Sequence, residues 1–258
     1  MWLQTEDRGE VRWLTLNRPE RKNAIPASGW KELERELGEF EQSASRVLVI
    51  TGAGGAFCSG ADLDPAGAVA YQGVVARHRR MKEVAAAATR LLRLPKPTLA
   101  AVDGVAAGAG MNLALACDLV IATRRARFSE IFVRRGLTVD FGGTWLLPRI
   151  VGLQRAKELA LTGRMVEADE ALALGLVLEL VEPDQLVTRV EELTRSLLAA
   201  APLAQMFTKQ ALGRGNLLGV EGALAWEGQS QSIAFATEDV SEGVAAFLEK
   251  RPPRFGGR

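Results

Sequence analysis

The chain has 258 residues, of which 48% are hydrophobic and 24% charged, and its formal net charge is +1. A chain of this length and composition can bury a large core, as one globular domain or as one domain with an appendage. The near-zero net charge argues against a nucleic acid or another polyanion as partner. The longest apolar run, 99–123, contains Asp103, Asn112 and Asp118, so it is not expected to span a bilayer.

Compartment and metal content are constrained by three sequence features. The first residues do not resemble a secretory signal peptide, so the protein is predicted to be cytoplasmic. Cys58 and Cys117 lack CxxC spacing and are interpreted as reduced thiols, neither a disulfide nor a metal site. With His78 as the single histidine, a histidine-rich metal centre is excluded, and no metal is predicted.

The first half of the chain alternates strands and helices. Residues 3–5 and 11–16 flank a polar turn and predict a β-hairpin. Apolar residues recur at helical spacing over 30–40, which predicts an amphipathic helix after Ser28. Residues 46–51 and 98–102 predict buried strands, and residues 67–94 a long helix with His78 packed on its apolar stripe.

The second half becomes purely helical. Residues 146–161 and 167–174 are predicted helices, and 177–181 is a strand. After residue 183 only helices are predicted, over 184–199, 202–213, 219–236 and 238–250. We therefore predict an α/β core over residues 1–200 and a helical segment over 201–258.

Two glycine-rich turns follow buried strands. The first is GAGGAFCSGADL (52–63); in the second, Gly104, Gly108 and Gly110 precede the helical pattern MNLALAC. The first is not a dinucleotide fingerprint, because Phe57 stands where the third glycine belongs. A strand-to-helix turn directs unpaired N–H groups at a ligand and can hold an oxygen that carries negative charge. Ordinary turns with glycines for close packing are the alternative.

These turns carry a resemblance to a known family. The segments 52–64 and 96–122, together with LNRPERKNAI (16–25), GLTVDFGGTWLLPRIVG (136–152), 170–181 and 247–258, resemble the crotonase, or enoyl-CoA hydratase/isomerase, family. The resemblance implies a ClpP/crotonase-like spiral of ββα units with a C-terminal α-helical trimerisation segment. It also implies an acyl-CoA substrate with no separate cofactor, since coenzyme A is part of the substrate, and a homotrimer or a hexamer built from two trimers.

The family's chemistry requires two backbone N–H groups that stabilise a thioester enolate. The resemblance places these donors at Ala61 and Ala109, with Gly60 and Gly108 giving clearance for the thioester. Many members have glycine at the position of Ala109. Alanine is compatible there if its φ is negative, because only the N–H group is used.

The acid/base residues differ from those of the family's hydratases. The two hydratase glutamates align with Asn112 and Phe132, and neither residue can shuttle a proton. Glu130 lies two residues earlier and would need a shifted register. Asp140 is the better candidate, because family isomerases of the phenylacetate ring-epoxide and dienoyl-CoA types carry an aspartate there. Alternatively, Asp140 is the N-cap of a helix that begins near Gly143.

The remaining site residues follow from the same resemblance. The region that holds the adenine and phosphates of CoA in relatives matches Arg18, Lys22, Ala24, Asp62 and Leu63, and Lys22 is suited to a phosphate. Phe132 and Trp145 are predicted to line the acyl pocket around Asp140. Phe255, in the basic tail, either packs on a neighbouring subunit's nucleotide or belongs to a frayed terminus.

The sequence thus predicts an enoyl-CoA isomerase that acts by double-bond or ring-epoxide isomerisation, with Asp140 as acid/base. An enoyl-CoA hydratase that adds water to a 2-enoyl-CoA is the first alternative. A non-catalytic relative that binds CoA or RNA is the second, and the near-neutral charge argues against RNA.

Overall fold

The structure, a computed structural model, describes residues 1–63 and 73–258. The chain divides into two compact units: unit 1 comprises residues 1–94 and 98–190, and unit 2 comprises residues 95–97 and 191–258. The division after residue 190 falls within helix α8 (Leu186–Leu198), upstream of the predicted boundary at residue 200.

Unit 1 is built on a six-stranded sheet with the order β1-β2-β3-β4-β6-β9. The predicted hairpin is confirmed, since β1 (Leu3–Arg8) and β2 (Val11–Leu16) pair antiparallel. The other pairs are parallel, and their strands are β3 (Val47–Gly52), β4 (Thr98–Val102), β6 (Leu119–Thr123) and β9 (Glu179–Val181). Both faces of β4 are buried, and every residue of the strand after Thr98 is apolar.

A smaller sheet has the order β5-β7-β8. β5 (Val105–Ala107) pairs parallel with β7 (Arg127–Ser129), which pairs antiparallel with β8 (Val166–Glu167). These strands are absent from the sequence prediction, because two or three residues show no periodicity. β5 runs directly into helix α4 (Ala109–Leu115), so this sheet sets where the second glycine turn lies.

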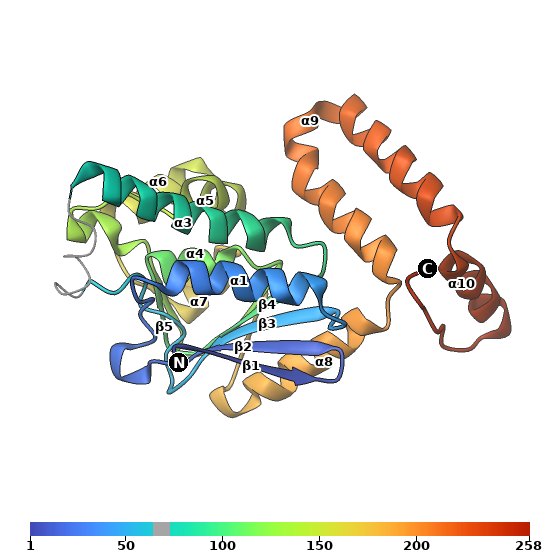
Figure 1. The fold of residues 1–258 in the computed structure, drawn as a ribbon, viewed down its shortest axis with the longest axis horizontal. Helices are drawn as coiled ribbons and strands as arrows, with labels where there is room; N and C mark the ends of the chain where they lie inside the picture. The colour runs from blue at the N-terminus through green and yellow to red at the C-terminus, as the bar shows by residue number, and fades with distance from the viewer. Residues whose placement is uncertain (64–72) are drawn as a thin grey trace. The chain divides into compact units, whose positions relative to one another are not determined.

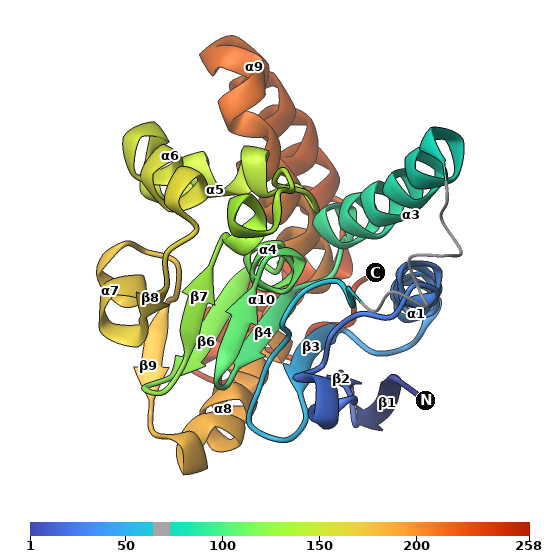
Figure 2. The same cartoon turned by 90° about the vertical axis from the view of Figure 1, so that its left-hand side faces the viewer.

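Helices cover the sheets. α1 (Gly29–Gln42) and α3 (Val74–Arg93) lie side by side, as Figures 1 and 2 show. α4 packs on β4 and β6, α5 (Gly143–Val151) packs on α4, and α6 (Leu153–Thr162) packs on α5. The remaining short helices of this unit are α7 (Ala168–Ala173) and the 3-10 helices η1 (Pro19–Arg21), η2 (Ile131–Arg135) and η3 (Pro183–Gln185).

Large apolar side chains fill the space between helices and sheet. Trp30 and Phe40 of α1, Phe57 of the first glycine turn and Phe128 of β7 are each fully buried. Burying one such ring stabilises the fold by about 1.5–3 kcal/mol. These side chains belong to one buried cluster, which therefore packs the first glycine turn and β7 against α1.

Two helix predictions need correction. The predicted helix 146–161 is two helices, because Gly152 adopts a φ of 76° between α5 and α6. His78 is exposed, and the buried residues of α3 are Val84, Ala87, Ala88 and Leu91. The reason is length: α3 has 20 residues and α1 has 14, and Figure 1 shows the first turns of α3 extending past α1. Residues 67–72 of that predicted helix lie outside the described residues.

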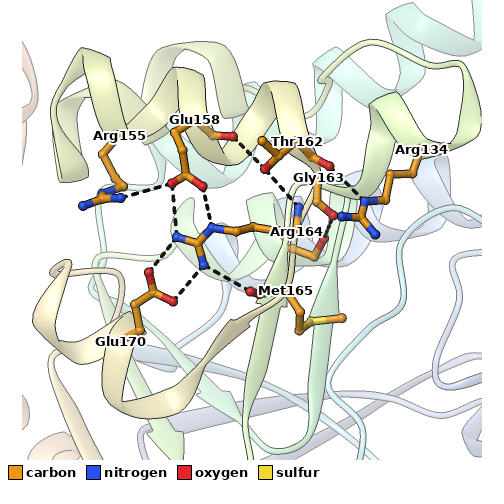
Figure 3. Close-up of polar contacts among 9 residues, drawn as sticks. Arg134, Arg155, Glu158, Thr162, Gly163, Arg164, Met165 and Glu170 are labelled. Carbon is orange, nitrogen blue, oxygen red and sulfur yellow. Dashed lines mark hydrogen bonds and ion pairs between the residues drawn. The ribbon is translucent and has the colours of Figure 1, made fainter.

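An ion cluster joins α6 to α7 (Figure 3). Arg164, between α6 and β8, donates to both carboxylate oxygens of Glu158 and to both of Glu170. Arg155 donates to Glu158 as well. These hydrogen bonds hold the pKa of Glu158 and of Glu170 below the ordinary value and raise that of Arg164. Every charge in this cluster has an opposite charge against it.

Unit 2 consists of helices and a tail. α9 (Pro202–Phe235) is interrupted at Gly219, where φ is 66°, and α10 (Glu238–Glu249) follows. The tail is tied to α10, because the Asp239 carboxylate accepts hydrogen bonds from the N–H groups of Gly256 and Gly257, at 2.7 and 2.9 Å. The predicted alternative of a frayed terminus is therefore wrong. No helix in the described part of the chain is long and apolar enough to cross a membrane.

Candidate functional site

The two glycine turns are bonded to each other. The N–H groups of Phe57 and Cys58 donate to the carbonyl of Val105, and Ala107 N–H donates to the carbonyl of Cys58 at 2.9 Å. Gly110 lies so close to this turn that a Cβ there would be 2.2 Å from the Cys58 carbonyl oxygen. Glycine is required at position 110 by this approach of two backbones.

The two turns bring the predicted donors together. A Cβ on Gly60 would lie 3.5 Å from the nitrogen of Ala109, so the backbone preceding Ala61 runs beside the start of α4. Gly60 has no Cβ to fill this space, and its φ of 95° lies in the region that favours glycine. Among the described residues, no hydrogen-bond acceptor faces the N–H of Ala61 or of Ala109. Two unpaired donors therefore lie at one place, which also receives the positive end of the α4 dipole.

The alanine at position 109 fits its backbone. Ala109 is the first residue of α4 and is not among the described residues with positive φ, whereas Gly108 has a φ of 55°. The condition set for an alanine at this position is met. Behind the turn, Cys58 is fully buried, and its thiol donates to the carbonyl of Asn23 at 3.2 Å. Burial raises the pKa of the Cys58 thiol to about 12.

The segment 17–25 packs against the first turn. The buried side chain of Asn23 donates to the carbonyls of Ala53 and Ala56 at 2.8 and 2.6 Å. The guanidinium of Arg18 donates to the carbonyl of Ala24 and pairs with Asp62, both at 2.9 Å. The guanidinium of Arg18 therefore holds Ala24 and Asp62 in place.

Lys22 and Leu63 differ from Arg18 because they face solvent. Lys22 has a φ of 49°, and its carbonyl accepts from Ser59 N–H at 2.9 Å. The backbone of Lys22 is therefore fixed on the first turn while its side chain is exposed. Of the residues predicted to bind CoA, Lys22 is placed to meet an anionic group arriving from solvent.

Asp140 stands in the loop between η2 and α5. Burial raises the pKa of its carboxyl to about 6, against the lowering effect of the positive charge of Arg80 on α3. Its Oδ1 atom is buried and has no hydrogen-bond partner among the described residues. The alternative role as N-cap is wrong, because Gly142 is the N-cap of α5 and no side chain caps that helix.

Glu130 lies beside Asp140 in the interior. Its side chain is 1% exposed, and burial together with the Asp140 charge raises its pKa to about 8. Asn112, also fully buried, donates from Nδ2 to Glu130 Oε2 at 3.4 Å and to the Asp140 carbonyl at 2.9 Å. The site therefore contains two carboxyl groups whose pKa values are set apart by their surroundings.

The two aromatic residues predicted for the acyl pocket lie in different places. Phe132, in η2, is buried, and its ring lies 3.6 Å from the position of a Cβ on Gly108, beside the second turn. Trp145 is exposed, with the guanidinium of Arg149 4.2 Å from its ring centroid. It lines a surface hollow together with Cys117, Leu172 and Leu178, and Asp140 is not among the residues that line this hollow. The structure does not bring Trp145 to Asp140.

Arg80, Asn112 and Glu130 gain their importance only from the fold. Arg80 is not among the residues predicted for the site, and Asn112 is predicted only as a position where the hydratase glutamate is absent. A polar residue within the apolar helix 109–115 is a signal that could have indicated a buried hydrogen bond for Asn112. No group of metal-ligating side chains is found within residues 1–63 and 73–258.

Comparison with known proteins defines the class. Residues 6–258 match the profile of the enoyl-CoA hydratase/isomerase family. The chain is 39% identical to the 1,2-epoxyphenylacetyl-CoA isomerase of Escherichia coli K12, over 96% of this chain and 95% of that protein. It is 38% identical to the short-chain-enoyl-CoA hydratase of Clostridium acetobutylicum, over 95% of this chain and 94% of that protein.

A solved structure agrees. The crystal structure of an enoyl-CoA hydratase from Bacillus anthracis matches with a TM-score of 0.94 and 32% identity, covering 100% of both chains. The fold class predicted from the sequence, α/β of the crotonase type, is therefore confirmed. The chain belongs to the enoyl-CoA hydratase/isomerase family.

Proposed function

We propose that the protein isomerises an acyl-CoA thioester, either by shifting the double bond of an enoyl-CoA or by isomerising a ring epoxide. The observation that carries this proposal is Asp140: a carboxyl with a pKa of about 6, in a loop that Asn112 hydrogen-bonds to the helix beginning with Ala109. At neutral pH this group is ionised, yet it is basic enough to accept a proton. A 1,3-proton shift needs one such base.

For the double-bond shift, the steps balance without a further reactant. The Asp140 carboxylate takes a proton from a carbon conjugated with the thioester, and the C–H bonding electrons move into the carbonyl as an enolate. The N–H groups of Ala61 and Ala109 stabilise the enolate oxygen, each by about 2.7–4 kcal/mol. Neutral Asp140 then returns the proton to a different carbon, so the product has the mass of the substrate.

Coenzyme A enters as part of the substrate, and no separate cofactor is required by these steps. The exposed ammonium of Lys22 is the proposed partner of a CoA phosphate. Arg18 and Asp62 contribute by fixing Ala24 and the first turn through their ion pair. Phe132 is proposed to form the apolar wall of the acyl site beside Gly108.

Hydration of a 2-enoyl-CoA is the second candidate. Glu130 supplies the second carboxyl that the activation of water requires, and a relative at 38% identity is named a hydratase. The burial of Glu130 argues against it, because a side chain 1% exposed does not meet a substrate water.

The two candidates give products of different mass. We would incubate 3-enoyl-CoA and 2-enoyl-CoA with wild type and with Asp140→Asn, and separate the products by liquid chromatography with mass detection. Isomerisation predicts a product of unchanged mass whose rate falls by about 10²- to 10⁴-fold in the variant. A product heavier by one water, formed equally by both proteins, would contradict the proposal.

Assembly is the last part of the proposal. Unit 2 exposes large apolar side chains that a homotrimer, or two paired trimers, would cover: Leu212, Leu224, Phe235, Phe247 and Leu248. Light scattering coupled to size-exclusion chromatography measures the mass directly. A stable monomer at micromolar concentration would contradict this assembly.

A further inference from the structure

A buried amide connects the oxyanion turn to the base. Asn112 lies three residues after Ala109 on α4, and its side chain is 0% exposed. One hydrogen of its Nδ2 donates to the main-chain carbonyl of Asp140 at 2.9 Å, and the other is directed at Glu130 Oε2 at 3.4 Å. In the described part of the chain, Asn112 hydrogen-bonds neither the Asp140 carboxyl nor the N–H of Ala61 or Ala109, but it links the segments that carry them.

The loop of Asp140 is shaped to receive this amide. A Cβ on Gly143 would lie 2.3 Å from Nδ2 and 2.6 Å from Oδ1 of Asn112, so the amide occupies the space of a side chain at position 143. Phe141, between the base and this glycine, has a φ of 49°, in the left-handed region that a bulky residue rarely adopts. The surrounding contacts must hold this conformation.

Glu130 is the second anchor of the amide. Three buried oxygens of the cluster have no donor among the described residues: Glu130 Oε1, Asn112 Oδ1 and Asp140 Oδ1. Neutral Glu130 adds one O–H donor to this group of acceptors, whereas ionised Glu130 adds a charge next to Asp140. The neutral form suits the cluster, and its pKa of about 8 keeps it neutral at pH 7.

Few charges other than Asp140 act on Glu130. α4 carries no charged residue, and Arg134, on the neighbouring η2, donates to the Thr162 carbonyl. The charged side chains of α6, which packs on η2, are the exposed Arg155 and Lys157 and the Arg164-paired Glu158. The charge of Arg80 acts on Asp140.

We propose that Asn112 and neutral Glu130 are positioning residues that fix Asp140 relative to the N–H of Ala109. Ionisation of Glu130 strengthens the hydrogen bond from Asn112 Nδ2, but it removes the O–H donor from a group of oxygens that have no other donor among the described residues, and it adds a charge beside Asp140, which displaces the base. The inference rests on the proposed function, since it deepens the role given to Asp140. It predicts a second limb in the pH dependence of the reaction. Activity rises as Asp140 ionises and falls as Glu130 ionises.

The test measures kcat and KM for isomerisation between pH 5 and 9.5. In the wild type, we expect kcat to fall above about pH 8. Glu130→Gln keeps the shape and cannot ionise, so the alkaline fall disappears while kcat at pH 7 drops by less than about fivefold. Asn112→Ala lowers kcat by about 10- to 100-fold at every pH, with little change in KM, because the base is misplaced.

Glu167→Gln is the matched control, because Glu167 is exposed on β8, away from the cluster, and the variant should keep the alkaline fall. An alkaline fall that persists in Glu130→Gln, or an Asn112→Ala variant with wild-type kcat, overturns the positioning role alone. A wild type that forms no isomer at any pH contradicts the proposed function instead.

An infrared titration provides a readout without substrate. The wild type should show a neutral-acid carbonyl band that disappears near pH 8 and is missing in Glu130→Gln. A wild type without this band at pH 7 would overturn the proposal even if the enzyme is an isomerase.

Discussion

Two clusters in unit 1 use carboxyl groups in opposite ways. Around Arg164, every carboxylate oxygen of Glu158 and Glu170 accepts a hydrogen bond from a guanidinium, and both pKa values are lowered (Figure 3). Around Asn112, the carboxyls of Glu130 and Asp140 each leave a buried oxygen without a partner in the described part of the chain, and both pKa values are raised.

The difference separates a structural task from a chemical one. The paired charges around Arg164 join α6 to α7 at the surface. Because the pKa values of Glu158 and Glu170 are lowered, these carboxyls stay ionised near neutral pH. Under-satisfied carboxyls in the interior reduce stability, yet they titrate in the range where a proton can be moved. The comparison therefore predicts effects of opposite sign when each cluster is altered.

Among the changes that test this comparison, Gly143→Ala is expected to have the largest effect, because it adds a methyl group to the space that the Asn112 amide fills. The added methyl group would meet the Asn112 amide at 2.3 Å. We expect kcat to fall by about 100-fold and the free energy of unfolding to fall by about 1–3 kcal/mol. Gly228→Ala is the control, because nothing lies within 4 Å of a Cβ at that helical position. A Gly143→Ala enzyme with wild-type kcat would show that the amide can move without consequence.

The acidic limb of the pH profile is the next largest effect. Asp140 must be ionised to act as base, and its pKa is about 6. We expect kcat/KM to fall about tenfold for each pH unit below 6. The charge of Arg80 lowers this pKa, so Arg80→Gln should move the limb to higher pH, and an unmoved limb would remove Arg80 from the site.

The free energy of unfolding should depend on pH differently in Glu130→Gln and in the wild type. A carboxyl whose folded pKa is raised from 4.5 to about 8 contributes stability below pH 4.5 that is lost as pH rises through 8. The glutamine variant does not undergo this loss. Its free energy of unfolding, relative to wild type, should therefore increase by about 1–3 kcal/mol between pH 5 and 8. Urea denaturation at several pH values measures it, and a difference independent of pH contradicts the burial of an ionisable group.

The smallest effect, with the opposite pH dependence, is expected for Glu170→Gln. The pKa of Glu170 is lowered by Arg164, so its pairing contributes stability above pH 4.5 that is lost as pH falls through the folded pKa. Because the pair is partly exposed, we expect a deficit of less than about 1 kcal/mol at pH 7, which shrinks on acidification. A deficit that grows on acidification would reverse the comparison.

The sequence predicts well what local spacing determines. The hairpin, the helix after Ser28 and both glycine turns follow from periodicity and from glycines that only close backbone approach explains. The cluster of Asn112 and Glu130 does not follow, because it depends on the burial of a glutamate that is two residues away from the expected register. The prediction of His78 in the core is wrong for a related reason: the apolar stripe of α3 is visible in the sequence, but which turns of α3 the shorter α1 covers is not.

The thiol of Cys58 can be used to measure how readily the first glycine turn opens in the native protein. Its thiol is fully buried, has a raised pKa and belongs to the turn that carries Ala61, so a disulfide reagent can reach it only after the turn opens. The rate of thiol labelling under native conditions therefore reports the free energy of local opening at this turn. Slower labelling in the presence of an acyl-CoA would show that the acyl-CoA binds at this turn, even when no reaction takes place.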